Sequence, residues 1–377
     1  MAFNYYIRSG QKRLRCGYTT GTCAALAAAG ATVRLLSGKE PETVSLMTPK
    51  GVLVETAPAF VMIKEETVVC GIVKDGGDDA DVTHGMTIEA HVKKRRYPGI
   101  FIDGGEGVGR VTKPGLDQPV GFAAINRMPR QMIEEQVRQV CDALGYDGGV
   151  EVIICIPGGR EVAQKTFNPM LGVEGGLSIL GTSGIVEPMS ERALVDTIAV
   201  ELRQAKALGA RRLILTPGNY GEAFLRENAI AGGSVPVIRC SNFIGEALDI
   251  AGTYSFEEIL LAGHIGKLVK LAGGVMNTHS RYADCRTELI CAHAVLCGAS
   301  REVCVALMQA ATTEACIKIL NSVHLREQVL DSLLDAVQRH LEYRAQGKYK
   351  IGAVLFSNQC GLSWQTQSAK EMMESWK

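Results

Sequence analysis

Glycine- and hydroxyl-rich loops that follow expected strands are the segments of this sequence best suited to chemistry. Gly181-Thr182-Ser183-Gly184 and Thr216-Pro217-Gly218-Asn219 are two of them. Glycine lets a ligand approach the backbone N–H groups closely, while hydroxyl and amide side chains add donors and acceptors. Each loop also has a plain structural interpretation, as a tight strand-to-helix turn at 181–184 and as a helix N-cap at Asn219. Neither loop has the Gly-x-Gly-x-x-Gly spacing of dinucleotide sites, and the sequence has no P-loop motif.

Loops of the same kind follow three other expected strands, at Gly158, at Ser241 and Asn242, and at His264. Ligands of open parallel sheets bind outside the carboxyl ends of the strands, so we expect all these loops to line one cofactor site. A lone histidine in a loop is usually structural or solvated. His264 is the candidate catalytic residue because it is the one histidine expected at this edge of the sheet.

A threonine-rich segment marks a second candidate site nearer the N-terminus. Thr19, Thr20 and Thr22 lie at the start of an alanine-rich helix expected over 24–36. The free N–H groups and the dipole of a helix N-terminus favour an anion. One threonine would be enough for a helix cap, so three threonines with two glycines favour binding.

Neither the acidic nor the thiol residues form a recognisable metal motif. Four aspartates crowd the segment 75–81, but they lack the EF-hand spacing, and turn chemistry is the favoured interpretation. The 12 cysteines include no Cys-x-x-Cys pair, and the spacing of Cys285, Cys291 and Cys297 places them on different faces of a helix. We expect reduced, mostly buried thiols and no protein-bound metal.

The expected secondary structure changes in character near residue 145. Before it, runs of short strands with few helices indicate an α+β domain over 1–145, with strands at 44–47, 52–55, 60–64, 67–73, 87–92 and 100–102. A helix is expected over 128–144, just before this point. After it, strands alternate with helices, from a strand at 150–156 through one at 177–180 to one at 351–356, and a single helix is expected over 302–319. This alternation indicates an α/β domain with a doubly wound, mostly parallel sheet over 146–377.

Composition narrows the class of protein. The chain has 377 residues, 46% of them hydrophobic, and 40 basic residues balance 40 acidic ones. A neutral chain is not typical of a nucleic-acid binder, and the lack of a long apolar stretch gives no reason to expect a membrane span or a signal peptide. We expect a cytoplasmic protein with small-molecule partners, no nucleic-acid partner and no membrane association; a homo-oligomer stays open.

Taken together, the motifs resemble those of the CbiD family, the cobalt-precorrin-5B C1-methyltransferases of the anaerobic cobalamin pathway. The similarity extends from about residue 14 to past residue 295, and little is similar beyond Ser300. Seven motifs occur in the family's order: 17–23, 75–81, 104–109, 156–161, 181–188, 216–219 and 264–267.

The resemblance implies that S-adenosylmethionine donates a methyl group to ring carbon C-1 of cobalt-precorrin-5B, giving cobalt-precorrin-6A, and it implies two domains. The 146–377 domain would then hold S-adenosylmethionine on the loops named above. The corrinoid carboxylates would need local cations and donors, for which we name Thr19, Thr20, Thr22, Arg110 and Lys113. A nicotinamide-dependent oxidoreductase and a non-catalytic corrinoid carrier are the alternatives.

Overall fold

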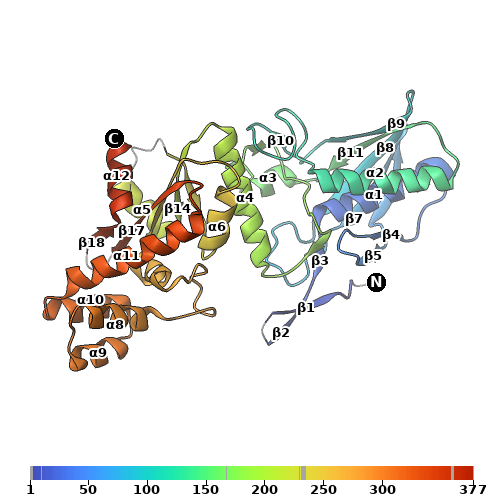
Figure 1. The fold of residues 1–377 in the computed structure, drawn as a ribbon. Helices are drawn as coiled ribbons and strands as arrows, with labels where there is room; N and C mark the ends of the chain where they lie inside the picture. Colours follow the sequence, from blue (N-terminus) through green and yellow to red (C-terminus); the bar gives the residue numbers. More distant parts are fainter. Residues whose placement is uncertain are drawn as a thin grey trace. The chain divides into compact units, whose positions relative to one another are not determined.

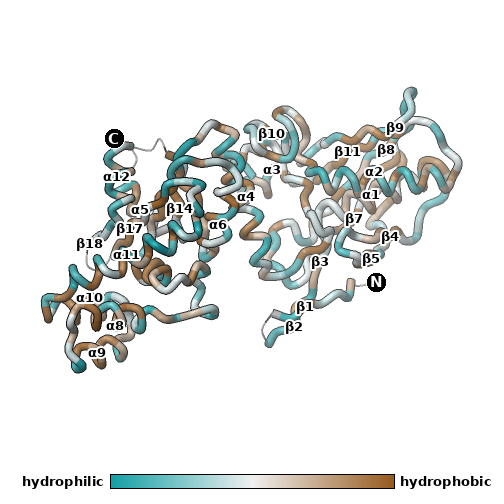
Figure 2. Tube along the Cα trace, viewed as in Figure 1, coloured by the Kyte–Doolittle hydropathy of each residue, from teal (hydrophilic) through white to brown (hydrophobic). Residues whose placement is uncertain are grey.

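The chain forms two compact units, Met1–Ser190 and Glu191–Lys377, each with its own sheet and apolar core (Figure 1). The computed structural model describes residues 3–9, 11–166, 168–228, 230, 235–357 and 361–376. The central strands of the C-terminal sheet, at 212–216, 258–264 and 350–357, are buried along nearly their whole length, and this part of the chain includes hydrophobic segments in Figure 2. Within the described ranges, no helix is long and apolar enough to cross a membrane.

The N-terminal unit is built on a five-stranded sheet of order β6-β7-β8-β11-β9. Its strands are β6 (Phe60–Lys64), β7 (Thr67–Val73), β8 (Thr87–Arg95), β9 (Gly99–Gly104) and β11 (Gly149–Cys155). β11 pairs antiparallel with β8 and parallel with β9, and the other two pairings are antiparallel. The carboxyl ends of β9 and β11 therefore lie side by side.

Helix α1 (Thr20–Ser37) is the buried centre of this unit and packs on β7 and β8 beside α2 (Arg127–Ala143). Its residues from Thr20 to Thr32 are all buried, which small alanine side chains permit against a sheet. The Thr19 side chain caps its start, and Gly38, with φ 72°, ends it. The predicted alanine-rich helix is confirmed.

Short paired segments surround the N-terminal sheet. They are β1 (Tyr6–Ser9) with β2 (Lys12–Arg15), β3 (Gly17–Tyr18) with β13 (Ile185–Val186), β4 (Val44–Met47) with β5 (Leu53–Thr56), and β10 (Arg110–Val111) with β12 (Val173–Glu174). The predicted hairpin at 44–55 is confirmed. The strand expected over 177–180 is not present, because Leu177 and Ile179 form only isolated bridges.

The expected boundary at residue 145 is not where the two units divide. Strand β11 follows that point in sequence, but it inserts between β8 and β9 of the first sheet. The loops at Gly158 and 181–184 therefore belong to the N-terminal unit. Local alternation of strands and helices cannot reveal this, because the pairing partners of β11 lie about 50 residues earlier in the chain.

The C-terminal unit has a sheet of order β15-β14-β16-β17-β18, parallel except for β18. The strands are β14 (Arg212–Thr216), β15 (Val237–Arg239), β16 (Glu258–His264), β17 (Lys350–Ser357) and β18 (Leu362–Gln365). From β14 the chain first adds a strand on one side and then returns to add β16 on the other. The strand order thus reverses between β14 and β16, where sheets of this kind bind ligands.

Helices cover both faces of this sheet, as its doubly wound form requires. In β14, Leu213 and Leu215 pack into one core and Ile214 into the other. The first face carries α4 (Glu191–Ala207), α6 (Ile244–Ala251) and α11 (Arg326–Ala345), and the second carries α5 (Asn219–Glu227) and α12 (Gln367–Ser375).

The remaining helices follow β16, except for α3 (Gly159–Ala163): α7 (Ile265–Leu268), the 3-10 turn η2 (Val269–Gly273), α8 (Arg286–Leu296), α9 (Arg301–Met308) and α10 (Thr313–Ser322). The prediction of a single helix over 302–319 was wrong. This segment forms two helices, because the Thr312 side chain accepts a hydrogen bond from the Ala315 N–H and starts a new helix there.

Candidate functional site

The threonines at the start of α1 bind the loop 180–184 of the same unit. Thr20 Oγ1 accepts a hydrogen bond from the Leu180 N–H at 3.0 Å, and Thr22 Oγ1 donates to the Gly184 carbonyl at 2.7 Å. The Thr19 N–H donates to the same Gly184 carbonyl at 3.0 Å. Two motifs that were expected to bind different ligands therefore hold each other.

Burial supports this structural role. Thr19, Thr20 and Thr22 are 5%, 4% and 0% exposed. Gly181 has φ 127°, and a Cβ atom there would lie 2.3 Å from Thr19 Oγ1, so the loop fits closely over the helix end. Thr182 is exposed and has no hydrogen-bond partner among the described residues. The three threonines are explained by their hydrogen bonds, which cap the helix and hold the loop 180–184 against it. Their role toward a ligand stays a prediction.

A cavity of about 560 Å³ opens at the carboxyl ends of β9 and β11. It is lined by Gly104, Gly105, Glu106, Gly107, Val108, Arg110, Gly158, Gly159, Arg160, Glu161, Glu174 and Gly175. Its volume lies within the ~300–1,000 Å³ that is usual for small-molecule sites. Two of the segments singled out in the sequence, 104–109 and 156–161, thus form one pocket.

Glycine is required where these two loops touch. A Cβ on Gly107 would lie 1.9 Å from the Ile156 carbonyl oxygen, and one on Gly159 would lie 2.4 Å from the Gly107 oxygen. The Ile156 N–H donates to the Glu106 carbonyl at 2.8 Å and ties the loops together. Six of the twelve residues that line the pocket are glycines, so part of its wall is backbone that no side chain covers.

Arg110 lies at this pocket but Lys113 does not line it. Arg110 donates two hydrogen bonds to the Asp103 carboxylate, at 2.8 and 3.0 Å, and one to the Gly104 carbonyl at 2.8 Å. Burial favours neutral Asp103, but the Arg110 hydrogen bonds outweigh it, so the pKa of Asp103 is lowered. Lys113 Nζ donates to the Met170 carbonyl at 3.1 Å. Arg110 is thus an anchored cation.

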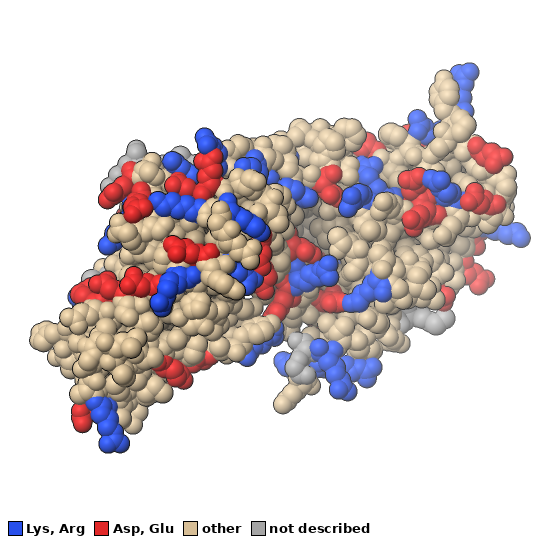
Figure 3. All heavy atoms as spheres, in the orientation of Figure 1, with Lys and Arg blue, Asp and Glu red and all other residues tan. Residues whose placement is uncertain are grey.

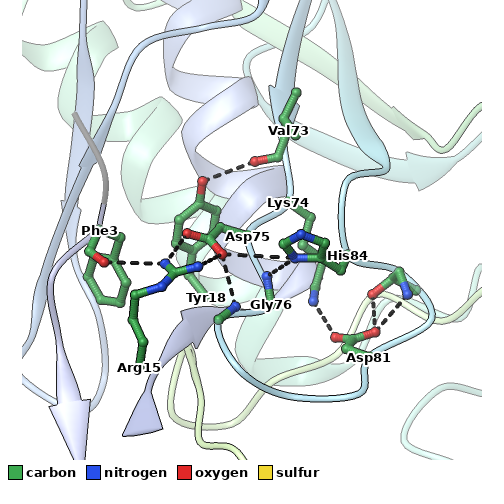
Figure 4. A network of polar contacts seen from close by, with 11 residues as sticks. Phe3, Arg15, Tyr18, Val73, Lys74, Asp75, Gly76, Asp81 and His84 are labelled. Carbon is green, nitrogen blue, oxygen red and sulfur yellow. Dashed lines mark hydrogen bonds and ion pairs between the residues drawn. The ribbon is translucent and has the colours of Figure 1, made fainter.

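The aspartate-rich segment 75–81 forms an internal polar network (Figure 4). Asp75 accepts from Arg15 Nη2 at 2.9 Å, and the Gly76 N–H donates to His84 Nδ1 at 2.9 Å. Lys74, 2% exposed, forms an ion pair with Asp81. Turn chemistry is therefore the role of this segment. Within the described ranges, no three metal-ligating side chains gather.

His264 lies at the edge of the C-terminal sheet, as the last residue of β16. Its Nδ1 accepts a hydrogen bond from the Gly266 N–H at 3.1 Å, so Nε2 carries the ring proton and donates to Glu314 Oε1 at 3.0 Å. Glu314, only 8% exposed, also accepts from Thr313 Oγ1 at 3.0 Å. Both ring nitrogens thus have protein partners, which orients the ring. Sequence reasoning missed Glu314 because it lies 50 residues further along the chain.

Lys267 links the two loops at the point where the strand order reverses. Its Nζ donates to the Pro217 carbonyl at 2.9 Å, and burial lowers the pKa of this lysine.

Other loop residues predicted to bind the cofactor contact their neighbours. Thr216 Oγ1 donates to the Gly218 carbonyl at 3.2 Å. Asn242 Oδ1 accepts from Thr278 at 3.2 Å, and the side chain of Asn219 lies outside the described part of the structure.

The residues predicted to bind the cofactor do not share one sheet edge. Gly158 and the four residues from Gly181 to Gly184 lie in the N-terminal unit, whereas Gly218, Asn219, Ser241 and Asn242 lie in the C-terminal unit with His264. The assignment of β11 to the first sheet is the physical reason.

Two family models match this chain, one in each of its two units. The CbiD family model matches residues 7–188, and the model of the CbiD C-terminal domain matches residues 277–367. The segment after Ser300, which shows little resemblance by motif, therefore belongs to the family pattern as well.

Similar proteins carry one name. The cobalt-precorrin-5B C(1)-methyltransferase of Ruminiclostridium cellulolyticum is 46% identical over 94% of this chain and 91% of its own. That of Alkaliphilus metalliredigens is 42% identical over 98% and 97%. A crystal structure of the cobalamin biosynthesis protein CbiD from Archaeoglobus fulgidus has 30% identity and a TM-score of 0.40, covering 74% of this chain and 86% of that one. On the family models and the curated relatives, the chain belongs to the CbiD family.

Proposed function

We propose that this chain methylates ring carbon C-1 of cobalt-precorrin-5B, with S-adenosylmethionine as methyl donor, and produces cobalt-precorrin-6A. The observation that carries the proposal is the 46% identity over 94% of the chain to a protein named for this reaction. Similarity over nearly the full length of both chains includes both units, so the whole enzyme and not one module is shared.

The proposed transfer needs groups that bind and orient the two reactants rather than a strong acid or base. S-adenosylmethionine, when bound, supplies a methyl group on a positively charged sulfur, which is already activated for transfer. The chain must align the two reactants and exclude water, and alignment alone can contribute several kcal/mol (about 7–11 in favourable cases). His264, with both ring nitrogens engaged, suits a positioning role.

A corrinoid with several acetate and propionate groups needs local positive charge on this neutral chain. Figure 3 shows basic and acidic side chains interspersed over most of the visible face, with basic ones gathered at the β1–β2 hairpin. Arg8, Lys12 and Arg13 are exposed there, and residues 3–15 contain no acid. The pairing sets Arg8 directly opposite Arg13, an unfavourable arrangement that an anionic ligand would relieve. We include this hairpin in the binding of the corrinoid carboxylates.

Incubation with S-adenosylmethionine and cobalt-precorrin-5B tests the proposal. Mass spectrometry of the corrinoid should show the gain of one methyl group, dependent on the methyl donor. Binding of the ring without methylation would instead identify a carrier. Turnover that requires a nicotinamide cofactor would identify an oxidoreductase.

A further inference from the structure

The cavity at the carboxyl ends of β9 and β11 includes two glycines that are explained by their backbone conformation and not by close packing. A Cβ built on Gly158 or on Gly175 meets no atom within 4 Å, in contrast to Gly107 and Gly159. Both residues line the cavity and have positive φ, 74° and 81°. Their bare backbone leaves space open inside a pocket whose other glycines are needed for loop contacts.

The charges of the cavity discriminate between ligands. The charged residues that line it are Glu106, Glu161, Glu174, Arg110 and Arg160. Arg110 is already neutralised by its ion pair with Asp103, so carboxylates are in excess. They repel a corrinoid rich in carboxylates, and they repel the phosphates of a nicotinamide dinucleotide as well. S-adenosylmethionine carries a sulfonium, an ammonium and one carboxylate, and its net positive charge suits this lining.

Several of these side chains are available to a ligand. Those of Glu106, Glu161 and Arg160 are exposed and have no hydrogen-bond or ion-pair partner among the described residues. Carboxylates can accept hydrogen bonds from an ammonium group and from ribose hydroxyls, and a guanidinium can bind a carboxylate through two parallel hydrogen bonds.

We infer that this cavity is the S-adenosylmethionine site, with Glu106 and Glu161 binding the cationic and hydroxyl groups and Arg160 the carboxylate. The inference rests on the proposed function and places the methyl donor in the N-terminal unit. The sequence alone had indicated Gly158, which lines this cavity, together with residues 181–184 and the loops at Gly218 and Asn242 of the C-terminal sheet.

Isothermal titration of the full chain with S-adenosylmethionine, without corrinoid, tests the inference. Gly158→Ala puts a methyl group into the cavity, and Glu161→Gln removes one charge. Each should weaken binding about tenfold, the effect of losing one good contact. Gly145→Ala is the matched control for the first, since Gly145 has φ 64° and equally open space outside the cavity. Glu66→Gln, on an exposed turn, controls for the second.

The outcomes separate the inference from the function on which it rests. Gly158→Ala and Gly145→Ala should have the same thermal stability, because their backbone strain is equivalent. If the parent chain binds S-adenosylmethionine and both cavity variants bind it within twofold of the parent, the cavity is not the site and the inference is wrong. If the parent chain does not bind S-adenosylmethionine, the methyltransferase proposal itself fails.

Discussion

The histidine at the end of β16 is held in one orientation from both sides. Gly266 N–H donates to its Nδ1, and its Nε2 donates to the buried carboxylate of Glu314. A ring whose two nitrogens are engaged cannot exchange a proton with a substrate without losing one of these contacts. The arrangement therefore favours positioning over acid–base chemistry.

His264→Ala should lower kcat roughly 10- to 100-fold, at or below the lower end of the ~100- to 10,000-fold that a positioned acid–base group contributes. His264→Gln, which can still hydrogen-bond, should recover part of the loss. The pH–rate profile from steady-state kinetics should show no limb that depends on His264. A limb that disappears in His264→Gln would show that His264 transfers a proton.

The Lys74–Asp81 ion pair should make the N-terminal unit sensitive to acid. Burial favours neutral Asp81, but the charge of Lys74 and hydrogen bonds from Lys74 and Thr83 outweigh it, so the pKa of Asp81 is lowered. A lowered folded pKa means that the stabilisation is complete above the unfolded value of about 4 and is lost as pH falls through the folded value.

Asp81→Asn should therefore reduce the free energy of unfolding by about 3–5 kcal/mol at pH 7, because Lys74 stays buried without its partner. The difference from the parent should shrink below about pH 4. Urea unfolding at several pH values measures both. Asp147→Asn, at an exposed carboxylate, is the control and should change little. A difference that stays constant with pH would contradict the role of this ion pair.

At the residue scale, the sequence predicted the local role of a segment better than it predicted which distant residues the segment contacts. Turn chemistry at 75–81 was predicted, but Arg15, which binds Asp75, comes from a strand 60 residues earlier. The threonines of 19–22 were correctly placed at a helix start, yet their hydroxyls meet a loop 160 residues later. Long-range partners of this kind follow from the tertiary fold and leave no local signal.

The loop 180–184 and the start of α1 act as one structural element. Thr20→Val keeps the shape of the side chain and removes the hydroxyl that bonds Leu180. It should destabilise the chain by about 1–3 kcal/mol, the cost of a buried group left unsatisfied. Thr182→Val, at the exposed residue of the loop, should be nearly neutral. Thermal unfolding compares the two, and a higher KM for the corrinoid with unchanged stability would restore a direct binding role for Thr20.

The basic hairpin gives a kinetic prediction. The double change Arg8→Gln and Arg13→Gln should raise KM for cobalt-precorrin-5B about tenfold, since two exposed charge contacts of up to about 0.7 kcal/mol each are lost. The difference from the parent should shrink at high salt. The control, Arg192→Gln with Arg301→Gln, removes the same charge at exposed positions. An equal KM in both double variants would exclude the hairpin from substrate binding.

At the scale of elements, strongly periodic segments were predictable and short ones were not. Helices α1 and α2 and strands β6 and β7 lie close to their expected bounds. The helical pattern of apolar residues over 302–319 continues across Thr312. The sequence therefore showed no sign that the chain breaks there into α9 and α10. Gly158 was predicted to bind the cofactor, but the cavity as a whole was not predicted, because its two loops come together only through the parallel pairing of β9 with β11.

The division into two units predicts which fragments of the chain fold by themselves. A fragment of residues 191–377 should unfold cooperatively on heating, because it contains a complete sheet and core. Residues 1–190 should do the same. Residues 1–145 should not, because β11, the strand between β8 and β9, is missing. Circular dichroism during heating measures this, and a cooperative transition in 1–145 would contradict the pairing of β11.

The whole-molecule organisation shows where sequence patterns stop being informative. A mixed α/β chain with parallel strands was predictable from the alternation of apolar strands and helices. The division at Ser190 was not, because β11 resembles the first strand of an α/β domain and only its pairing reveals otherwise. Because the units divide at Ser190 and not at residue 145, Gly158 and residues 181–184 belong to the N-terminal unit. The residues predicted to bind the cofactor are therefore divided between the two units.

Methyl transfer itself is best followed with S-adenosylmethionine labelled with carbon-13 in the methyl group. The purified chain, cobalt-precorrin-5B and the labelled donor should give a corrinoid with one labelled methyl on C-1, seen as a single new carbon resonance with S-adenosylhomocysteine in equal amount. No labelled corrinoid, or a label on a different ring carbon, would contradict the assignment of this chain as the C-1 methyltransferase.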